Sequence, residues 1–193
     1  DEIRKVCNPY PSKFERTHTL KEARELEDGT ADVSIAGRII FMRKMGKLSF
    51  VRIRDLESDM QLEIKIDTVG EETYSFFKKL IDSGDFIGAH GEIFTTQTGE
   101  KTLRVKTLTF LGKALKPLPE KFHGLQDTEL KYRQRYTDLI MNEESRRVFL
   151  GRSKLYAFIH KYLGENGFLE VETPILQNAV SGASAKPFYT HHN

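Results

Sequence analysis

The sequence predicts a small all-β barrel of five strands and one helix, followed by the beginning of an α+β domain. Two observations carry this prediction. Residues 31–112 hold five segments in which apolar and polar side chains alternate, with one helical segment between the third and the fourth. Residues 140–193 hold one long helical pattern and then a short apolar alternation that ends at Pro174. The pattern changes across a proline-containing stretch, so we expect two domains joined by a stiff connector.

The strands of the first domain are bounded by glycine and turn residues. We expect strands over residues 31–43, 48–55, 60–66, 85–96 and 101–111, and a helix over residues 71–82. Gly37 inside the first strand marks a bulge or a sharp bend, and Met45-Gly46-Lys47 supplies a turn. Three strands, a helix and two strands is the order of an OB-fold, a Greek-key barrel that often binds oligonucleotides. A three-layer α+β domain remains the alternative, and the long bent first strand favours the barrel.

The bulk composition excludes several classes of protein. Charged residues are 30% and hydrophobic residues 38% of the 193 residues, which is typical of a globular chain rather than a disordered one. The 30 basic and 28 acidic residues leave a net charge of +2, so any nucleic-acid surface must be local. The single cysteine, Cys7, excludes an internal disulfide and fits a reducing compartment. No apolar run approaches the roughly 20 residues of a membrane span.

The alternation in the second and third strands predicts which side of the sheet faces outward. Val51 and Ile53 point to one side, and Phe50 points to the other with Arg52 and Arg54. The uniformly apolar side must be the core. In the third strand the same rule separates Leu62, Ile64 and Ile66 from Gln61, Glu63 and Lys65. Phe50 is therefore an aromatic side chain on the polar face, where an exposed ring is as often incidental as functional.

Charge and hydrogen-bonding groups gather near that ring. Residues 38–54 contain no acidic residue. They contain six basic ones, namely Arg38, Arg43, Lys44, Lys47, Arg52 and Arg54. Such a patch can meet phosphates while Phe50 stacks on a base, which is worth about 1–3 kcal/mol. Gln61 offers a donor and an acceptor and Glu100 accepts only, so both can bind base edges.

The flanking segments are expected to be helical. Residues 1–30 form a lead-in with a helix over 20–27, where Thr19 and Glu22 have the spacing of a capping box. In the joint, residues 113–139, a helix begins at Asp127 or Thr128. Pairs four apart share a face of that helix. They are Tyr132 with Tyr136 and Lys131 with Arg135. Spacing alone favours a solvated linker helix.

The second domain is expected to begin with a long amphipathic helix. Asn142 is a good N-cap, with Glu143 and Glu144 in the positive first turn. Apolar residues recur at helical spacing on two stripes, Val148, Leu155, Ile159 and Tyr162 on one and Phe149 and Tyr156 on the other. The helix should end near Asn166-Gly167, and a strand over residues 168–173 should follow. Two apolar stripes suit burial on two sides.

Several strings in this sequence resemble class II lysyl-tRNA synthetases. KPLPEKFHGLQD followed by YRQRYTDL resembles the joint between the two domains of that family. GRIIFMRKMGKLSFVRIRD resembles the first hairpin of its anticodon-binding domain, and GFLEVETPIL resembles motif 1. The resemblance covers nearly the whole chain. It implies an OB-fold anticodon-binding domain over residues 31–112 and the start of an α+β class II synthetase catalytic domain over residues 140–193.

The resemblance also implies site residues. The family aromatic that matches Phe50 stacks on the central uridine of the anticodon, and positions that match Arg43, Gln61 and Glu100 contact that base. Pro174 matches the signature proline of the motif that builds the dimer interface. The family loop GGA-x-A-[RK]-PF closes over lysine, and Gly182 matches a position that touches the amino acid. Here the loop differs, with Ser181 in place of its first glycine and Val180 in place of the preceding proline.

The implied parent protein is a cytoplasmic, homodimeric lysine–tRNA ligase that uses ATP and Mg²⁺ to activate L-lysine and transfers it to tRNA-Lys. Motifs 2 and 3, which hold ATP and Mg²⁺ in the family, do not occur in these residues. We therefore expect this chain alone to be inactive and assign no catalytic or metal-binding residue, the pair His191-His192 included. The alternatives are an aspartyl or asparaginyl synthetase, a non-catalytic OB-fold binder of single-stranded nucleic acid, and an enzyme that lysylates a translation factor.

Overall fold

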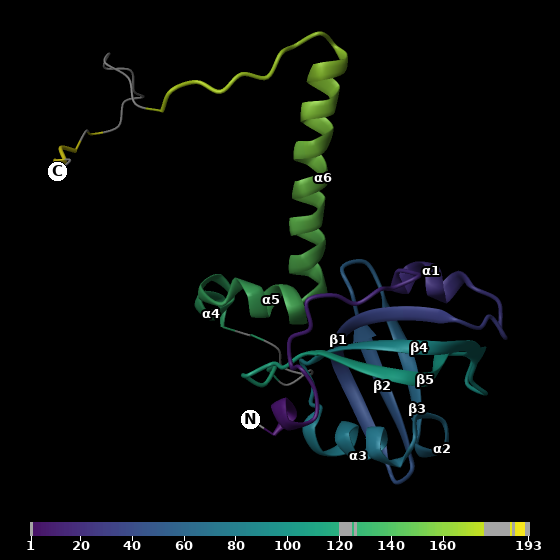
Figure 1. The fold of residues 1–193 in the computed structure, drawn as a ribbon. Coiled ribbons are helices and arrows are strands. Elements are labelled where there is room, and N and C mark those ends of the chain that lie inside the picture. The colour runs from purple at the N-terminus through teal and green to yellow at the C-terminus, as the bar shows by residue number, and fades with distance from the viewer. Residues whose placement is uncertain (1, 120–124, 126, 176–185, 187, 192–193) are drawn as a thin grey trace. The chain divides into compact units, whose positions relative to one another are not determined.

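The structure is a computed structural model, and it describes residues 2–119, 125, 127–175, 186 and 188–191. The chain divides into two units, residues 1–123 and 124–193. The first unit holds a closed barrel, and the second holds helices (Figure 1). Each unit is described by itself.

Five strands close the barrel in the order β1-β2-β3-β5-β4. They are β1 (Val33–Met45), β2 (Leu48–Arg54), β3 (Asp59–Lys65), β4 (Phe86–Thr95) and β5 (Lys101–Gly112). Neighbouring strands are antiparallel except β3 and β5, whose parallel pairing closes the barrel. The predicted OB-fold is confirmed, and each strand begins and ends within two residues of its expected bounds.

Glycine shapes the first hairpin. Met45 pairs with Leu48, so Gly46 and Lys47 form a two-residue turn, and Gly46 has φ 52°. Of the two options predicted at Gly37, the bulge is wrong, because the register shifts between Ile39 and Phe41, and the sharp bend stays a prediction. Gly37 serves a different need, since a Cβ there would lie 2.9 Å from the carbonyl oxygen of Arg54 on β2.

Short helices cover the barrel. They are η1 (Ile3–Lys5), α1 (Leu20–Glu25), α2 (Ile66–Val69) and α3 (Glu71–Leu80). The capping box of α1 is confirmed, since Thr19 Oγ1 accepts from the Glu22 amide at 3.2 Å and Glu22 Oε2 accepts from the Thr19 amide at 2.7 Å. Ile66 was expected to end a strand but begins α2, because its apolar side chain fits a helix start as well as a strand end.

The core lies inside the barrel, on the side that the alternation selected. Val51 is 1% exposed, and Ile53, Leu62 and Ile64 are fully buried. Phe77 of α3 is also fully buried in this cluster, and Figure 1 shows α3 lying across one end of the barrel. Each such side chain contributes about 1.5–3 kcal/mol by leaving water. This burial fixes which faces of β2 and β3 point outward.

Two lysines satisfy the carbonyl groups at the end of α3. Lys44 Nζ donates to the carbonyl oxygens of Lys78 and Ile81, at 2.9 and 3.0 Å. Lys113 Nζ donates to the Leu80 carbonyl at 3.0 Å and to the fully buried Asp85 at 2.9 Å. Cations at a helix C-terminus are favourable because they meet the negative end of the helix dipole.

The second unit begins with α4 (Thr128–Arg133) and α5 (Arg135–Met141). Asp127 caps α4 as predicted, with its carboxylate accepting from the Leu130 amide at 2.8 Å. The single helix that would place Tyr132 and Tyr136 on one face is wrong, because the backbone leaves the helical region at Gln134, with φ −112° and ψ 52°. The amides of Thr137 and Asp138 donate to the Gln134 carbonyl, so α5 begins as a separate helix.

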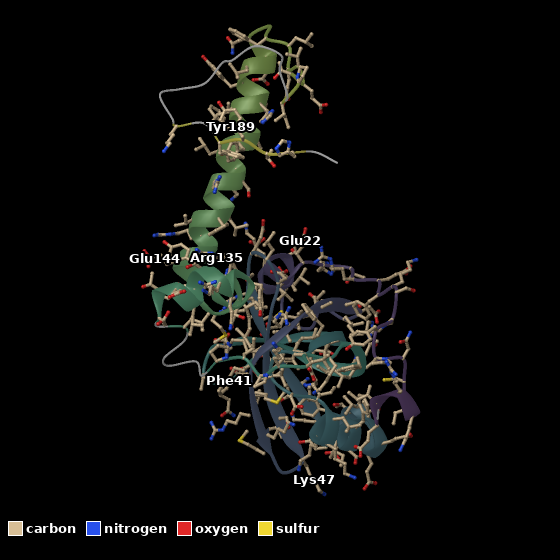
Figure 2. The ribbon with its side chains drawn as sticks, turned by 90° about the vertical axis from the view of Figure 1, so that its left-hand side faces the viewer. Glu22, Phe41, Lys47, Arg135, Glu144 and Tyr189 are labelled. Atoms are coloured by element: carbon tan, nitrogen blue, oxygen red, sulfur yellow. The ribbon has the colours of Figure 1, made fainter. Side chains whose placement is uncertain are left out.

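Arg135 holds the start of this unit together. Its guanidinium donates to the buried carboxylate of Asp138 at 2.8 Å. Its Cζ atom also lies 4.8 Å from the ring centroid of Tyr132 and 5.1 Å from that of Phe149. Figure 2 shows Arg135 beside the start of the long helix, near Glu144. The same mixed apolar and ionic contacts therefore link three successive helices.

The long helix is α6 (Glu143–Glu165), and its predicted cap and end are confirmed. Asn142 Oδ1 accepts from the amides of Glu144 and Ser145, and Asn166 ends the helix. Its apolar side chains are exposed, including Val148, Leu155, Phe158, Ile159 and Tyr162. None of the helices in the described part of the chain combines the length and hydropathy of a membrane-spanning segment.

The strand predicted over residues 168–173 is wrong for the chain as described. These residues have no regular structure, and Leu169 is 86% exposed. A strand is stable only when another strand accepts and donates its backbone hydrogen bonds, and the described part of this unit contains no strand to pair with. Pro174 lies in the same irregular segment, and Gly182 lies outside the described residues.

Gly91 offers a test of the β4–β5 pairing. The register shifts between His90 and Gly91, and a Cβ at Gly91 would overlap the carbonyl oxygen of Arg104 on β5. We expect Gly91→Ala to lower the free energy of unfolding by about 1–3 kcal/mol, as overpacking does. Denaturant unfolding followed by circular dichroism measures this change. Gly112→Ala is the control, because its Cβ would meet ordinary contacts at 3.8 Å or more. Equal midpoints for the two variants would contradict the close approach.

Candidate nucleic-acid interface

The outward face of β1, β2 and β3 brings the predicted residues together. Phe50 lies directly opposite Arg43 on β1 and opposite Glu63 on β3. Residues opposite each other on neighbouring strands point to the same side of the sheet, with Cβ atoms about 5 Å apart. Phe50 is half-buried and Arg43 is exposed. The pairing therefore sets a guanidinium beside the phenyl ring, a neighbour that alternation within one strand could not identify.

Gln61 and Glu100 lie one step further along the same face. Gln61 is opposite Arg52 on β2, and Arg52 Nη2 donates to Glu100 Oε1 at 3.0 Å. The Gln61 amide nitrogen donates to Thr102 Oγ1 at 3.0 Å. All four residues predicted to contact a base thus share one face of the barrel, although Glu100 comes from the loop before β5.

Hydrogen bonding determines which groups of this face remain for a ligand. The Thr102 hydroxyl donates to the Glu100 carbonyl at 3.0 Å, so it can only accept from the amide of Gln61. This orients the amide with its oxygen free. Within the described residues, Gln61 Oε1, Glu100 Oε2 and the Arg43 guanidinium have no hydrogen-bond partner. The face therefore presents two acceptors and one cationic donor around an aromatic ring.

The basic patch is smaller than its six residues suggest. Four of the six are engaged by the protein itself, namely Arg38, Lys44, Arg52 and Arg54. Arg38, for example, donates to the Gly84 carbonyl at 2.9 Å and lies 4.1 Å from the ring centroid of Phe86. The side chains of Arg43 and Lys47 make no hydrogen bond or ion pair with any residue that the structure describes. Figure 2 shows Lys47 at the end of the barrel, in the turn of the first hairpin.

Asp59 immobilises the two arginines of β2. Arg52 Nη1 donates to Asp59 Oδ1 at 2.8 Å, and Arg54 Nη2 donates to Oδ2 at 3.2 Å. Burial acts to raise the pKa of Asp59, but the hydrogen bonds from Arg52 and Arg54 outweigh it, so the pKa lies below its usual value. Burial likewise acts to lower the pKa of Arg52, but its bonds to Asp59 and Glu100 outweigh it and raise the pKa. Both groups stay charged at neutral pH, and Arg52 holds Glu100 in place.

Sequence reasoning missed one part of this face. Glu63 was expected on a solvated side, but only 7% of its side chain is exposed, between Arg104 and Lys65. Phe94 of β4 also faces outward, with the Arg104 Cζ atom 4.3 Å from its ring centroid. Alternation along β4 could have identified Phe94, whereas the burial of Glu63 depends on a strand distant in sequence. The described residues contain no group of His, Cys, Asp and Glu that could hold a metal ion.

Comparison with known proteins agrees with this geometry. Residues 33–111 match the family model described as OB-fold nucleic acid binding domain, and residues 127–193 match that of tRNA synthetases class II (D, K and N). A lysine–tRNA ligase from Lactococcus lactis subsp. cremoris (strain MG1363) is 49% identical over 96% of this chain and 39% of its own length.

Other relatives give the same result. The lysine–tRNA ligases of Lysinibacillus sphaericus (strain C3-41) and Streptococcus pneumoniae serotype 4 are 48% and 47% identical, again over 96% of this chain and 39% of their own lengths. The chain thus spans about two fifths of the length of the curated relatives that it matches. Its barrel, the helices that follow and these matches agree, and the chain is similar to part of the class II lysine–tRNA ligases.

Proposed function

We propose that this chain is the anticodon-binding domain and the beginning of the catalytic domain of a class II lysine–tRNA ligase. The observation that carries the proposal is the pairing of Arg43 with Phe50 on the outward face of the OB barrel, beside the free oxygens of Gln61 and Glu100. An aromatic ring, a cationic donor and two acceptors can bind an unpaired base by stacking and by its edge.

The chemistry of the four groups favours uracil. Uracil presents an N3–H donor between two carbonyl acceptors, so the N–H can donate to Gln61 Oε1 or Glu100 Oε2 and a carbonyl can accept from Arg43. Cytosine presents a bare N3 acceptor at the same place, which a carboxylate repels. Because Arg52 fixes Glu100 at 3.0 Å, the carboxylate cannot turn away at low cost. We therefore assign Phe50 to stacking and Arg43, Gln61 and Glu100 to the edge of a central anticodon uridine.

The whole protein's activity follows from its relatives as a proposal. It would activate L-lysine with ATP and Mg²⁺ and transfer it to tRNA-Lys in the cytoplasm. We propose that ATP and Mg²⁺ bind in the part of the ligase that this chain, at 39% of the relative's length, does not span. We keep Gly182 as a lysine contact, and the domain bounds 1–30, 31–112, 113–139 and 140–193, as proposals.

The exposed apolar side of α6 supports a homodimer. Phe158 and Tyr162 stack on each other, with ring centroids 6.0 Å apart, and are 62% and 54% exposed. Apolar side chains on a long helix are rarely left in water over several turns. We propose that the rest of the catalytic domain covers one stripe and a second subunit covers the other, with Pro174 at that interface.

One alternative retains support from a specific observation. The barrel alone has the face of a general binder of single-stranded nucleic acid, because stacking on Phe50 does not require a particular base. Preference for an unstructured strand such as poly(dT) over a tRNA stem-loop would favour that reading.

Phe50 offers a direct test of base stacking. We expect Phe50→Ala to weaken binding of the chain to an RNA stem-loop with a uridine-rich loop by about 5- to 150-fold, the cost of one stacked base. Filter binding at fixed salt measures the affinity. Phe50→Tyr is the matched control, because it keeps the ring, and it should bind within about twofold of the parent chain. An unchanged affinity for Phe50→Ala would show that the bases bind elsewhere.

Glu100 offers a test of the contacts to the base edge. The parent chain should prefer uridine to cytidine at the central loop position by about tenfold, since a good edge contact discriminates by about 1–3 kcal/mol. Glu100→Gln should reduce this preference, because an amide can donate to the N3 of cytosine. Competition binding with the two stem-loops measures the ratio. A preference that is the same in parent and variant would remove Glu100 from the base site.

A further inference from the structure

Arg104 lies on the same outward row as Phe50, two strands away. The register pairs Phe50 of β2 with Glu63 of β3, and Glu63 with Arg104 of β5. Neighbouring strands are about 4.8 Å apart, so the Arg104 backbone lies about 10 Å from that of Phe50 across the sheet. Leu62 and Leu103, the neighbours of this row, are fully buried, which fixes Glu63 and Arg104 outward.

The guanidinium of Arg104 is held in a defined orientation. Its Nε donates to Glu63 Oε1 at 3.1 Å, and one face of its plane lies over Phe94, with Cζ 4.3 Å from the ring centroid. These two contacts fix the plane and leave its outer edge open. Within the described residues, neither terminal nitrogen of Arg104 has a hydrogen-bond partner. The side chain is 36% exposed, so these four N–H groups are accessible.

Neutralising Glu63 does not account for this arrangement. Lys65 Nζ already lies 3.1 Å from Glu63 Oε2, so the buried carboxylate has one cation besides Arg104. A guanidinium that served only the carboxylate would gain more by binding it with two parallel N–H bonds. Here it uses Nε alone and turns its fork outward. The cluster of Glu63, Lys65 and Arg104 carries a net positive charge next to the base site.

We propose that Arg104 is a second RNA contact of this face, which donates from its terminal nitrogens to a phosphate of the nucleotide beside the base stacked on Phe50. The proposal rests on the proposed function of the face. Charge-assisted bonds from a guanidinium fork to phosphate oxygens are strong and geometrically matched. Phosphate contacts position an RNA strand without reading its sequence, so Arg104 would orient the strand for the base contacts of Phe50 and Glu100.

The double variant Glu63→Gln/Arg104→Gln tests this without changing the net charge of the chain. Each phosphate contact on single-stranded nucleic acid contributes about 0.7 to the slope of log affinity against log salt concentration. We expect the double variant to lower this slope by about 0.7 for the uridine-rich stem-loop and to weaken uridine and cytidine loops equally. The control is Lys13→Gln/Glu15→Gln, an exposed ion pair at 2.6 Å on the lead-in, which should leave the slope unchanged.

The possible outcomes distinguish a failure of the Arg104 proposal from a failure of the proposed function on which it rests. An unchanged salt slope in the double variant, with binding that still depends on Phe50, overturns the role of Arg104 alone. A reduced affinity that differs between uridine and cytidine loops also overturns it, because that result would mean a base contact. Loss of Phe50 dependence in the parent chain overturns the proposed face and the Arg104 contact together. Circular dichroism of the double variant confirms that a changed slope comes from a folded barrel.

Discussion

The closed pairing of the five strands is the constraint on which the rest of the structure depends. Closure puts the apolar residues of β2 and β3 inside, where Ile53, Leu62 and Ile64 are fully buried. The alternate residues must then point outward, and the register decides which of them meet. A shift of one residue between β1 and β2 would separate Arg43 from Phe50 and turn the ring into the core. The candidate RNA site is thus a consequence of the register that the core requires.

Ion pairs and cation–π contacts hold several cations of this face in place. Asp59 and Glu100 hold Arg52, and Glu63 with Phe94 holds Arg104, so these cations need little ordering when a ligand arrives. Among the six basic side chains of the patch, Arg43 and Lys47 have no partner in the described part of the chain, and they lie toward the hairpin turn. The face therefore combines cations that neighbouring groups hold in place with two that no described residue holds.

Much of the fold could be predicted from the sequence because its signals are local. The alternation of β2 located Phe50, and the capping residues Thr19 and Asn142 located helix starts. The burial of Glu63 could not be predicted, because its partner Arg104 arrives through the parallel β3–β5 pairing. The break at Gln134 has no glycine or proline beside it that could have predicted it, and the expected strand after α6 has no partner among the described residues. Resemblance to a family, rather than periodicity, selected Arg43 and Glu100.

The most direct test of the central claim is a photocrosslinking experiment. An RNA stem-loop with 5-iodouridine at the central loop position is bound to the chain and irradiated, and the crosslinked peptide is identified by mass spectrometry. The account predicts a crosslink to Phe50 on β2, because the uracil ring would lie against that phenyl ring. A crosslink confined to the lead-in or to α3, with none on β2, would contradict it.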